Sequence, residues 1–276
     1  MERAVIRRKA TEHDGEARDG GVQSVDRALH IIETLAEDDE GYRLSDLAVR
    51  TGLSTSTAHR LLTTLEKRRF VQFDRTESKW HVGAQSFAVG ATFTRRRNFV
   101  AQAMPYLRKL RDQTRETANL AVVDDESIIV LTRIESREIM RSLTKVGGRV
   151  AMVASGVGKA VLATYPDDDV SAIIRRHGMP RLTEKSIVRA SDLFRELAAV
   201  RRQGYAVDDE EARMGLRCVA AVVFNDCSEP LAAISVSGMT SRVTEERLPE
   251  LGNAVRLVAG ELTAAIGGVA PPTKTT

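Results

Sequence analysis

Apolar residues recur at helical spacing in the first part of the chain, and they alternate along much of the remainder. The regular pattern begins near Ser24, a predicted helix N-cap, and the first unit ends at Gly41. Residues 1–21 mix charged residues and glycine with few apolar ones, so they predict a disordered tail. The apolar face of the first predicted helix consists of Val25, Ala28, Leu29, Ile32 and Leu35.

Two further helices and a hairpin follow at short intervals. Residues 44–50 predict a short helix, and Gly52 can adopt the positive φ of a tight turn. Ser54 is placed to cap a third helix, which runs to about Arg69. Two short alternating runs then flank the polar turn 74–78, which is typical of a β-hairpin. This order of elements predicts a winged helix-turn-helix.

A predicted linker helix over residues 84–97 leads into the second half of the chain. Its apolar residues Phe87, Val89, Ala91 and Phe93 need burial, and a lone linker helix has no domain to cover them. We therefore expect a homodimer at least, and a dimer of dimers as the next step. A long helix from Asn98 to about residue 116 opens the C-terminal domain.

The C-terminal half segregates runs of strands from runs of helices. This arrangement predicts an α+β fold, in which an antiparallel sheet is covered by helices. The expected strands are residues 119–123, 128–134, 139–143, 205–208, 218–224 and 231–237. The expected helices are 158–164, 168–176, 192–203 and a last one after Thr244 that ends near Gly267. The predicted divisions are a tail at 1–21, a DNA-binding domain at 22–83, a linker at 84–98, an effector domain at 99–268 and a disordered tail at 269–276.

Charge is concentrated in one part of the chain. Residues 51–97 hold nine basic and three acidic side chains, a net charge of +6, whereas the whole chain carries only +3. A compact basic segment on an otherwise mildly acidic protein is typical of a surface that binds nucleic-acid phosphates.

Several classes of protein lack support in the sequence. The chain has no apolar run long enough for a membrane span, and its N-terminus does not resemble a secretory signal. Cys218 and Cys227 fit neither a zinc pair nor a disulfide framework, so we expect two reduced thiols in a cytoplasmic protein. No HExxH, GxSxG or clustered His/Cys pattern occurs, so no metal, cofactor or catalytic residue is predicted.

The third predicted helix has the features of a DNA-reading element. Its first turn is slim and polar, so hydroxyl and backbone N–H groups there can bind phosphate. His59 and Arg60, one turn further on, can reach base edges or phosphates. Arg68 and Arg69 at its end are additional phosphate contacts, whereas residues 95–97 fit a solvated linker face equally well. The predicted DNA-binding residues are Ser54, Thr55, Ser56, Thr57, His59, Arg60, Lys67, Arg75 and Lys79.

The last two predicted strands bring small polar groups together. If they form a hairpin with equal pairing, Cys218 lies opposite Ser237 and Phe224 opposite Leu231. Because side chains alternate between faces, Cys218, Ser235 and Ser237 then share one face. Small residues packed under a covering helix explain this pattern as well as a binding site does. The opposite face carries Val219, Val223, Ile234 and Val236, which is an ordinary core.

Two further features favour a ligand site. The turn at Ser155 and Gly156 precedes a helix, and free backbone N–H groups there can bind an anion. It lacks the glycine pattern of a nucleotide loop, so a small carboxylate fits better than a nucleotide. Asp208, near a strand end, can accept a hydrogen bond from a ligand hydroxyl, although it could equally be a surface turn residue.

Seven stretches of the chain carry a family resemblance. They are SVDRALHIIETL, LSDLAVRTGLSTSTAHRLLTTLEKRRFV, KWHVG, RETANLAV, ASGVGKAVLA, RRQGYAVDDEEARMGLRCVAAVVF and AAISVSGMTSRVTEERL. Together they resemble the isocitrate lyase regulator (IclR) family from Ser24 to about Ile266. The resemblance implies a winged helix-turn-helix, a linker helix that pairs protomers and a GAF-like effector domain. It also implies dimers that often pair into tetramers on pseudo-palindromic operator DNA.

The motifs resemble most the glyoxylate-responsive branch, represented by the allantoin-utilisation repressor. The resemblance implies a ligand set of Ser155, Gly156, Asp208, Leu216, Cys218, Ser235 and Ser237. Val153, Ala151 and Met239 depart from the branch pattern, which affects the expected size of the pocket. The implied effector is a small 2-oxo acid, with glyoxylate as the leading candidate.

Two alternatives stay open. The chain could be an enzyme or a metabolite-binding module without a DNA role, which a gel shift with upstream DNA would decide. It could also be a regulator that senses an aromatic acid, although a face of Cys and Ser suits a ring poorly.

Overall fold

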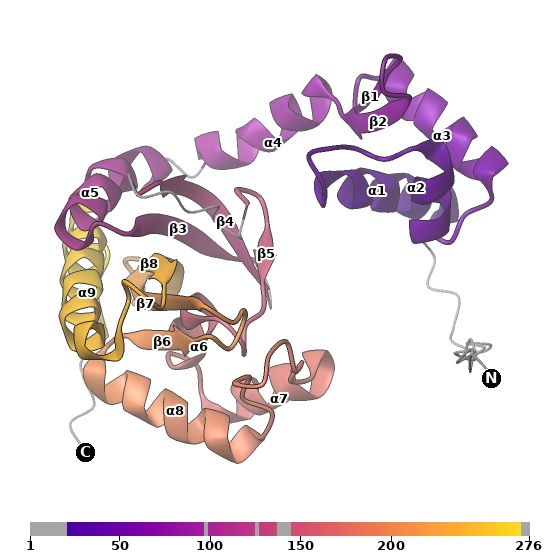
Figure 1. Ribbon diagram of the computed structural model, residues 1–276. Helices are drawn as coiled ribbons and strands as arrows, with labels where there is room; N and C mark the ends of the chain where they lie inside the picture. Colours follow the sequence, from indigo (N-terminus) through magenta and orange to yellow (C-terminus); the bar gives the residue numbers. More distant parts are fainter. Residues whose placement is uncertain (1–20, 97–98, 125–126, 137–144, 272–276) are drawn as a thin grey trace, which may run out of the picture. The chain divides into compact units, whose positions relative to one another are not determined.

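The chain divides into two compact units, residues 1–95 and 96–276. The computed structural model describes residues 21–96, 99–124, 127–136 and 145–271 (Figure 1). Residues 1–20 and 272–276 of the two predicted tails therefore lie outside the described residues.

The N-terminal unit has three helices, a two-stranded antiparallel sheet and a fourth helix. Its core is formed by Ile31, Leu35, Tyr42, Leu47, Leu62, Val71 and Trp80. Tyr42 pairs with Trp80 as an isolated bridge, which ties the segment after the first helix to the hairpin. The elements are α1 (Gln23–Ala36), α2 (Leu44–Arg50), α3 (Thr55–Lys67), β1 (Val71–Asp74), β2 (Lys79–Val82) and α4 (Ala84–Arg96).

The helix-turn-helix forms where local sequence predicts it. Gly52 has φ +65° in the turn after α2. Ser54 then caps α3, because its hydroxyl accepts a hydrogen bond from the backbone N–H of Thr57 at 3.3 Å. Both predictions are confirmed, and they rest on glycine freedom and capping chemistry within a few residues of chain.

Helix α1 corrects two expectations. Its N-cap is Val22, whose carbonyl accepts from the N–H of Val25 at 2.8 Å, so Ser24 lies inside the helix and does not cap it. Only the second half of α1 packs on the core, through Ile31 and Leu35. Val25 and Leu29 are each 55% exposed, so the predicted apolar face is not covered by this unit along its whole length.

The C-terminal unit is built on one antiparallel sheet with strand order β5-β4-β3-β8-β7-β6. All neighbouring strands run antiparallel, which agrees with the predicted α+β class. The strands are β3 (Thr117–Asp124), β4 (Ser127–Ile134), β5 (Arg149–Val150), β6 (Ala206–Asp209), β7 (Leu216–Phe224) and β8 (Pro230–Met239). The helices are α5 (Phe99–Thr114), α6 (Gly156–Leu162), α7 (Asp167–His177), α8 (Ala190–Gln203), the 3-10 turn η1 (Glu245–Arg247) and α9 (Leu248–Ala265).

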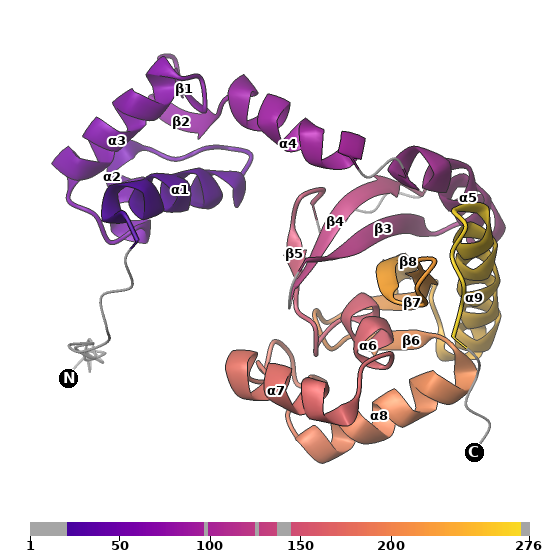
Figure 2. The same ribbon diagram turned by 180° about the vertical axis from the view of Figure 1, so that it is seen from behind.

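Helices cover both faces of this sheet (Figures 1 and 2). Helices α5 and α9 lie side by side on one face, over an apolar cluster that includes Val219, Ile234 and Val236. Helices α6, α7 and α8 lie on the other face, over smaller residues such as Ala206, Ala220 and Ala233. The small side chains on the second face let α6 approach the strands closely.

Two strand predictions need comment. The strand expected at 139–143 lies outside the described residues, and β4 instead pairs with β5. The equal pairing of β7 with β8 is confirmed from Cys218 opposite Ser237 to Val223 opposite Ala232. The prediction of Phe224 opposite Leu231 is wrong, because a bulge shifts the register and pairs Phe224 with Pro230.

Candidate functional site

The predicted DNA-reading residues begin at the first turn of α3. Ser54, Thr55 and Ser56 are exposed, and Thr57 is half-buried. The Ser54 hydroxyl lies 3.1 Å from Ser56 Oγ and 2.8 Å from Thr57 Oγ1. This small network holds the hydroxyls at the amino end of the helix, where backbone N–H groups also point outward.

His59 and Arg60 lie one turn further along α3, and both are exposed. Neither forms an ion pair with any of the residues that the structure describes. The opposite side of α3 is buried through Ala58 and Leu62, so the helix presents a fixed polar face to solvent. Such a face has the width and polarity that a major groove accepts.

The predicted phosphate contacts differ from one another. Lys67 and Arg75 are exposed. Lys79 is only 26% exposed, and its Nζ lies 3.2 Å from Glu77 and 4.0 Å from Glu40. Its charge is therefore partly neutralised within the protein. Lys67 and Arg75 are the stronger candidates for phosphate binding.

The turn of the wing is held by Asp74. Its Oδ1 accepts from the N–H of Thr76 at 2.7 Å and of Glu77 at 3.2 Å. These backbone hydrogen bonds keep the pKa of Asp74 below its usual value, since they favour the ionised carboxylate. The hairpin that carries Arg75 is thus pre-shaped before any DNA is bound.

The predicted effector residues on β6, β7 and β8 share one face of the sheet. Asp208 pairs with Cys218, and Cys218 pairs with Ser237. Ser235 lies two residues along from Ser237 and pairs with Ala220, so its side chain points to the same side. Leu216, at the start of β7, completes the set. Asp208, Leu216, Cys218, Ser235 and Ser237 are called the β6–β8 polar face below.

The Ser155–Gly156 turn lies directly against this face. The Ser155 hydroxyl donates to the carbonyl of Ala151 at 2.7 Å and accepts from the N–H of Gly158 at 3.0 Å, so it caps α6. A Cβ atom added at Gly156 would come within 3.0 Å of the Cys218 carbonyl oxygen. Glycine therefore permits the close approach of α6 to β7. The structure brings together all seven predicted effector residues.

Asn119 of β3 is a polar neighbour that sequence reasoning missed. It pairs with Ser235, is 8% exposed and donates through Nδ2 to Ser235 Oγ at 3.3 Å and Ser237 Oγ at 3.2 Å. An amide in the otherwise apolar run Ala118–Val123 was the available signal. Its effect is to orient both serine hydroxyls.

Lys159 of α6 was also missed. It is fully buried, and its Nζ forms an ion pair with Glu211 and a second one with Glu196 at 3.1 Å. A lysine inside the apolar segment from Ala154 to Ala163 was the signal, because a buried lysine requires paired carboxylates. Lys159 places a positive charge close enough to Asp208 of the β6–β8 polar face to lower the pKa of that carboxyl group.

Burial shifts the pKa of two groups on this face. Removal from water raises the pKa of Asp208 to about 6, although backbone N–H groups of Ala212 and Glu211 and the charge of Lys159 oppose the shift. Burial also raises the pKa of Cys218 to about 11, and the neighbouring Asp208 adds to the effect. The thiol is therefore protonated at neutral pH and is a hydrogen-bonding group, not a nucleophile.

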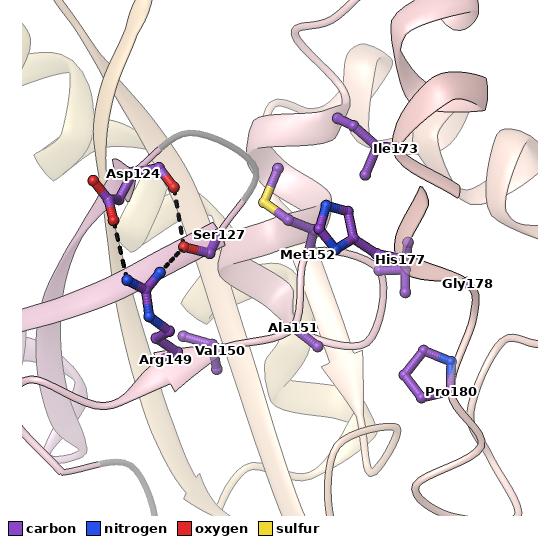
Figure 3. A pocket seen from close by; sticks show the side chains of 11 residues that line it. Asp124, Ser127, Arg149, Val150, Ala151, Met152, Ile173, His177, Gly178 and Pro180 are labelled. Carbon is purple, nitrogen blue, oxygen red and sulfur yellow. Dashed lines mark hydrogen bonds and ion pairs between the residues drawn. The ribbon is translucent and has the colours of Figure 1, made fainter. Parts of the chain in front are cut away.

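A pocket of about 520 Å³ lies beside this region, next to β5 and the end of α7 (Figure 3). Arg149 donates to Ser127 and to Asp124, and Met152, Ile173 and His177 line the other side. None of the predicted effector residues lines it. The two regions are joined through Ala151, which lines the pocket and accepts the Ser155 hydrogen bond.

The described part of the chain contains neither a candidate metal site nor a candidate membrane span. No three His, Cys, Asp or Glu side chains there gather in a way that suits a metal ion. Of the helices in the same residues, none combines the length and apolar character that crossing a membrane requires.

Comparison with known proteins gives matches to both units. Residues 24–75 match the IclR helix-turn-helix domain, and residues 91–264 match the bacterial transcriptional regulator IclR C-terminal domain. The solved IclR transcriptional regulator of Alicyclobacillus acidocaldarius superposes with a TM-score of 0.76 at 26% identity, over 90% of this chain and all of that one. The solved structure of the Thermotoga maritima IclR superposes with a TM-score of 0.70 at 25% identity, over 88% of this chain and 98% of that one.

Curated relatives align along almost their whole length. The acetate operon repressor of Salmonella typhimurium is 41% identical, over 90% of this chain and 92% of the relative. The transcriptional repressor IclR of Escherichia coli is 40% identical, over 91% of this chain and 92% of the relative. The Escherichia coli repressor AllR is 32% identical, over 91% of this chain and 93% of the relative. The chain therefore belongs to the IclR family of DNA-binding bacterial transcriptional regulators.

Proposed function

We propose that this regulator is a repressor whose affinity for its operator is set by a small 2-oxo acid, with glyoxylate as the first candidate. The relatives named above are themselves called repressors, which supports the direction of control. A repressor of this kind acts in the cytoplasm, on double-stranded operator DNA. The effector binds the C-terminal unit and changes the affinity of the N-terminal unit for DNA.

The exposed polar face of α3 supports DNA reading. Its first turn offers hydroxyls and backbone N–H groups to phosphates, and Arg60 extends from the same face with no acidic partner among the described residues. Arginine in the major groove reads guanine through two hydrogen bonds. We therefore place α3 in the groove and the hairpin of β1 and β2 beside the backbone.

The observation that carries the ligand proposal is the convergence of polar groups on a sheet face where Asp208 and Ser235 are buried and Cys218 and Ser237 are half-buried. Ser155 and Gly156 supply the turn, Ser235 and Ser237 supply hydroxyls, and Asp208 supplies a carboxyl group. A carboxylate fits the backbone donors of the turn, and an aldehyde or its hydrate fits the hydroxyls and Asp208. The set is small and polar, which favours a small acid over an aromatic one.

Exposed apolar residues support self-association. On α4, Phe87 is 79% exposed and Val89 49%, and on α1 Val25 and Leu29 are each 55% exposed. Apolar side chains exposed in this number on two helices suit burial against a second copy. The proposed unit is a homodimer that reads a pseudo-palindromic operator, with a dimer of dimers as the larger assembly. Light scattering that shows a monomer at micromolar concentration would contradict it.

Calorimetry tests the ligand directly. We expect glyoxylate to give binding heat with the full chain, and we expect it to change the mobility of a complex with upstream DNA. 4-Hydroxybenzoate serves as the aromatic comparison. If the aromatic acid gives heat and glyoxylate gives none at millimolar concentration, the aromatic-acid alternative replaces the proposal. If upstream DNA is not retarded at low salt, the DNA role fails.

A further inference from the structure

A buried cluster of charged side chains lies next to Asp208 of the β6–β8 polar face. Lys159 of α6 is fully buried and pairs with Glu211 and with Glu196. Glu211 is 5% exposed, and its Oε2 has no hydrogen-bond partner among the described residues. Asp208, three residues before Glu211, is 4% exposed. One buried cation therefore lies among three carboxyl groups, two of them almost wholly removed from water.

Other charged groups near Asp208 are engaged elsewhere. Asp209 on the same strand binds Arg217 and, at 3.3 Å, Lys185. Lys185 also binds Glu210 at 2.6 Å, and Arg217 also binds Glu245 at 3.1 Å. Cys218, which faces Asp208 from β7, is neutral at physiological pH because burial raises its pKa to about 11. These neighbours give an incoming anion no free counter-charge.

An anionic ligand at this site comes close to Asp208. A Cβ atom built at Gly156 lies 3.4 Å from the backbone nitrogen of Asp208, so a carboxylate on the Ser155–Gly156 turn is next to this residue. Lys159 is already neutralised by Glu211 and Glu196. Two carboxyl groups that share a site of low dielectric constant cannot both stay ionised without a large energetic cost.

The geometry of Asp208 suits a proton on one oxygen. Its Oδ1 accepts from the N–H of Glu211 at 2.8 Å and of Ala212 at 3.3 Å. No hydrogen bond within the described part of the chain engages Oδ2. Burial already raises the pKa of this carboxyl group to about 6 in the absence of ligand. A proton on Oδ2 would leave both backbone hydrogen bonds to Oδ1 intact.

We propose that the effector binds together with one proton, which Asp208 takes up on Oδ2, so that this side chain donates a hydrogen bond to the bound acid. The proton comes from solvent, and no other bond forms or breaks. The inference rests on the proposed binding of a carboxylic acid to this face. Asp208 would then favour anionic ligands, because only a negatively charged ligand raises the pKa of its carboxyl group enough to keep it protonated.

The consequence is a pH-dependent affinity. With the pKa of Asp208 near 6 in the free protein, binding at pH 7.5 takes up close to one proton. The dissociation constant of the complex then rises about tenfold for each pH unit above 7. Operator control would therefore respond to effector more sensitively in acidified cells.

Titration calorimetry of glyoxylate into the full-length wild type, at pH 7.5 in phosphate and in HEPES, whose tertiary amines do not condense with the aldehyde, tests the proposal. The two buffers release protons with different heats, so a binding heat that differs between them measures proton uptake. We expect uptake of about one proton. Equal heats in the two buffers would overturn proton uptake while leaving glyoxylate as the effector. No heat in either buffer at millimolar glyoxylate would overturn both proposals.

Two variants locate the proton. Asp208→Asn carries an amide donor where the proposed proton sits, so we expect it to bind glyoxylate with a dissociation constant that changes less than twofold between pH 6 and 8. The matched control Asp209→Asn removes the neighbouring carboxylate and should keep the wild-type pH dependence. Proton uptake that persists in Asp208→Asn, in a protein that still binds DNA, would contradict the assignment to Asp208.

Discussion

The first turn of α3 and the β6–β8 polar face both gather small hydroxyls and charged groups, but in opposite environments. Ser54, Ser56 and Arg60 are exposed, so water can solvate their polar atoms when DNA is absent. Ser235 and Asp208 are 2% and 4% exposed, so their polar atoms depend on partners inside the protein. The proposed DNA surface therefore tolerates substitution at Ser56 and Arg60 with little loss of stability, whereas each buried group of the proposed effector site affects folding as well as binding.

The two regions also differ in how far apart along the chain their parts lie. The α3 surface comes from one helix and its cap, within residues 54–60. The proposed effector site combines a turn at Ser155, a strand end at Asp208 and a strand centre at Ser235, which sheet pairing and the packing of α6 on the sheet bring together. A ligand there can thus alter the packing of several elements at once, which suits a site that must favour one of two arrangements of the protein.

The largest expected effect lies at the turn that begins α6. In Gly158→Ala the new Cβ would overlap the carbonyl oxygen of Met152, a backbone atom that cannot move away freely. We expect the C-terminal unit to lose about 3 kcal/mol or more of stability, measured by denaturant unfolding. Gly260→Ala is the matched control, because its Cβ meets nothing within 4 Å in α9 and should stabilise slightly. Equal stability of the two variants would show that the α6 turn is not tightly packed.

The next effect concerns the buried carboxyl group. The pKa of Asp208 is raised in the folded state, so its stabilising contribution is complete below the unfolded value of 3.8 and is lost as pH rises to about 6. Asp208→Asn does not titrate. Its stability relative to wild type should therefore rise by about 2–3 kcal/mol between pH 4 and 7 and stay constant above that. If the free energies of unfolding of wild type and Asp208→Asn change equally with pH across this range, the burial of Asp208 is contradicted.

A smaller effect is expected on the DNA side. Arg60→Ala should weaken specific operator binding by about 1–3 kcal/mol if Arg60 contacts a base through two hydrogen bonds. Stability should change little, since the side chain is exposed. Fluorescence anisotropy with labelled operator gives the dissociation constant. Unchanged operator affinity of a folded Arg60→Ala variant would contradict the placement of α3 in the major groove.

The smallest effect separates two lysines. Lys67→Ala should lower the slope of log K against log salt by about one unit, as expected for the loss of one phosphate contact. Lys79→Ala should lower it less, because Glu77 already shares its charge. The comparison uses anisotropy titrations at several salt concentrations. A larger slope change for Lys79 than for Lys67 would mean that the ion pair between Lys79 and Glu77 in the β1–β2 hairpin breaks when DNA binds.

The same contrast explains what the sequence alone could predict. The Ser54 cap and the Gly52 turn depend on chemistry within a few residues, and both were predicted correctly. The pairing of Cys218 with Ser237 was also predicted, by equal counting from the turn, but that counting fails at Phe224 because a bulge was not visible. Such a bulge depends on sheet geometry that no local pattern encodes.

The missed residues come from segments that are distant in sequence. Asn119 reaches Ser235 only through the pairing of β3 with β8, and Lys159 reaches Glu211 only because α6 packs on the sheet. Both stood out as polar residues in apolar runs, but the partner of each could not be identified without the fold. On α1, the exposed Val25 and Leu29 look like core residues in one chain, and a second copy is the proposed cover.

The most direct test of the link between the two regions is an operator-binding titration with glyoxylate as the variable. We predict that millimolar glyoxylate changes the dissociation constant of the wild-type operator complex at least fivefold, and that Asp208→Ala blunts this change while its DNA affinity without effector matches wild type. Wild-type operator affinity that does not vary with glyoxylate, in a protein that binds the acid by calorimetry, would contradict coupling between the buried site and the α3 surface.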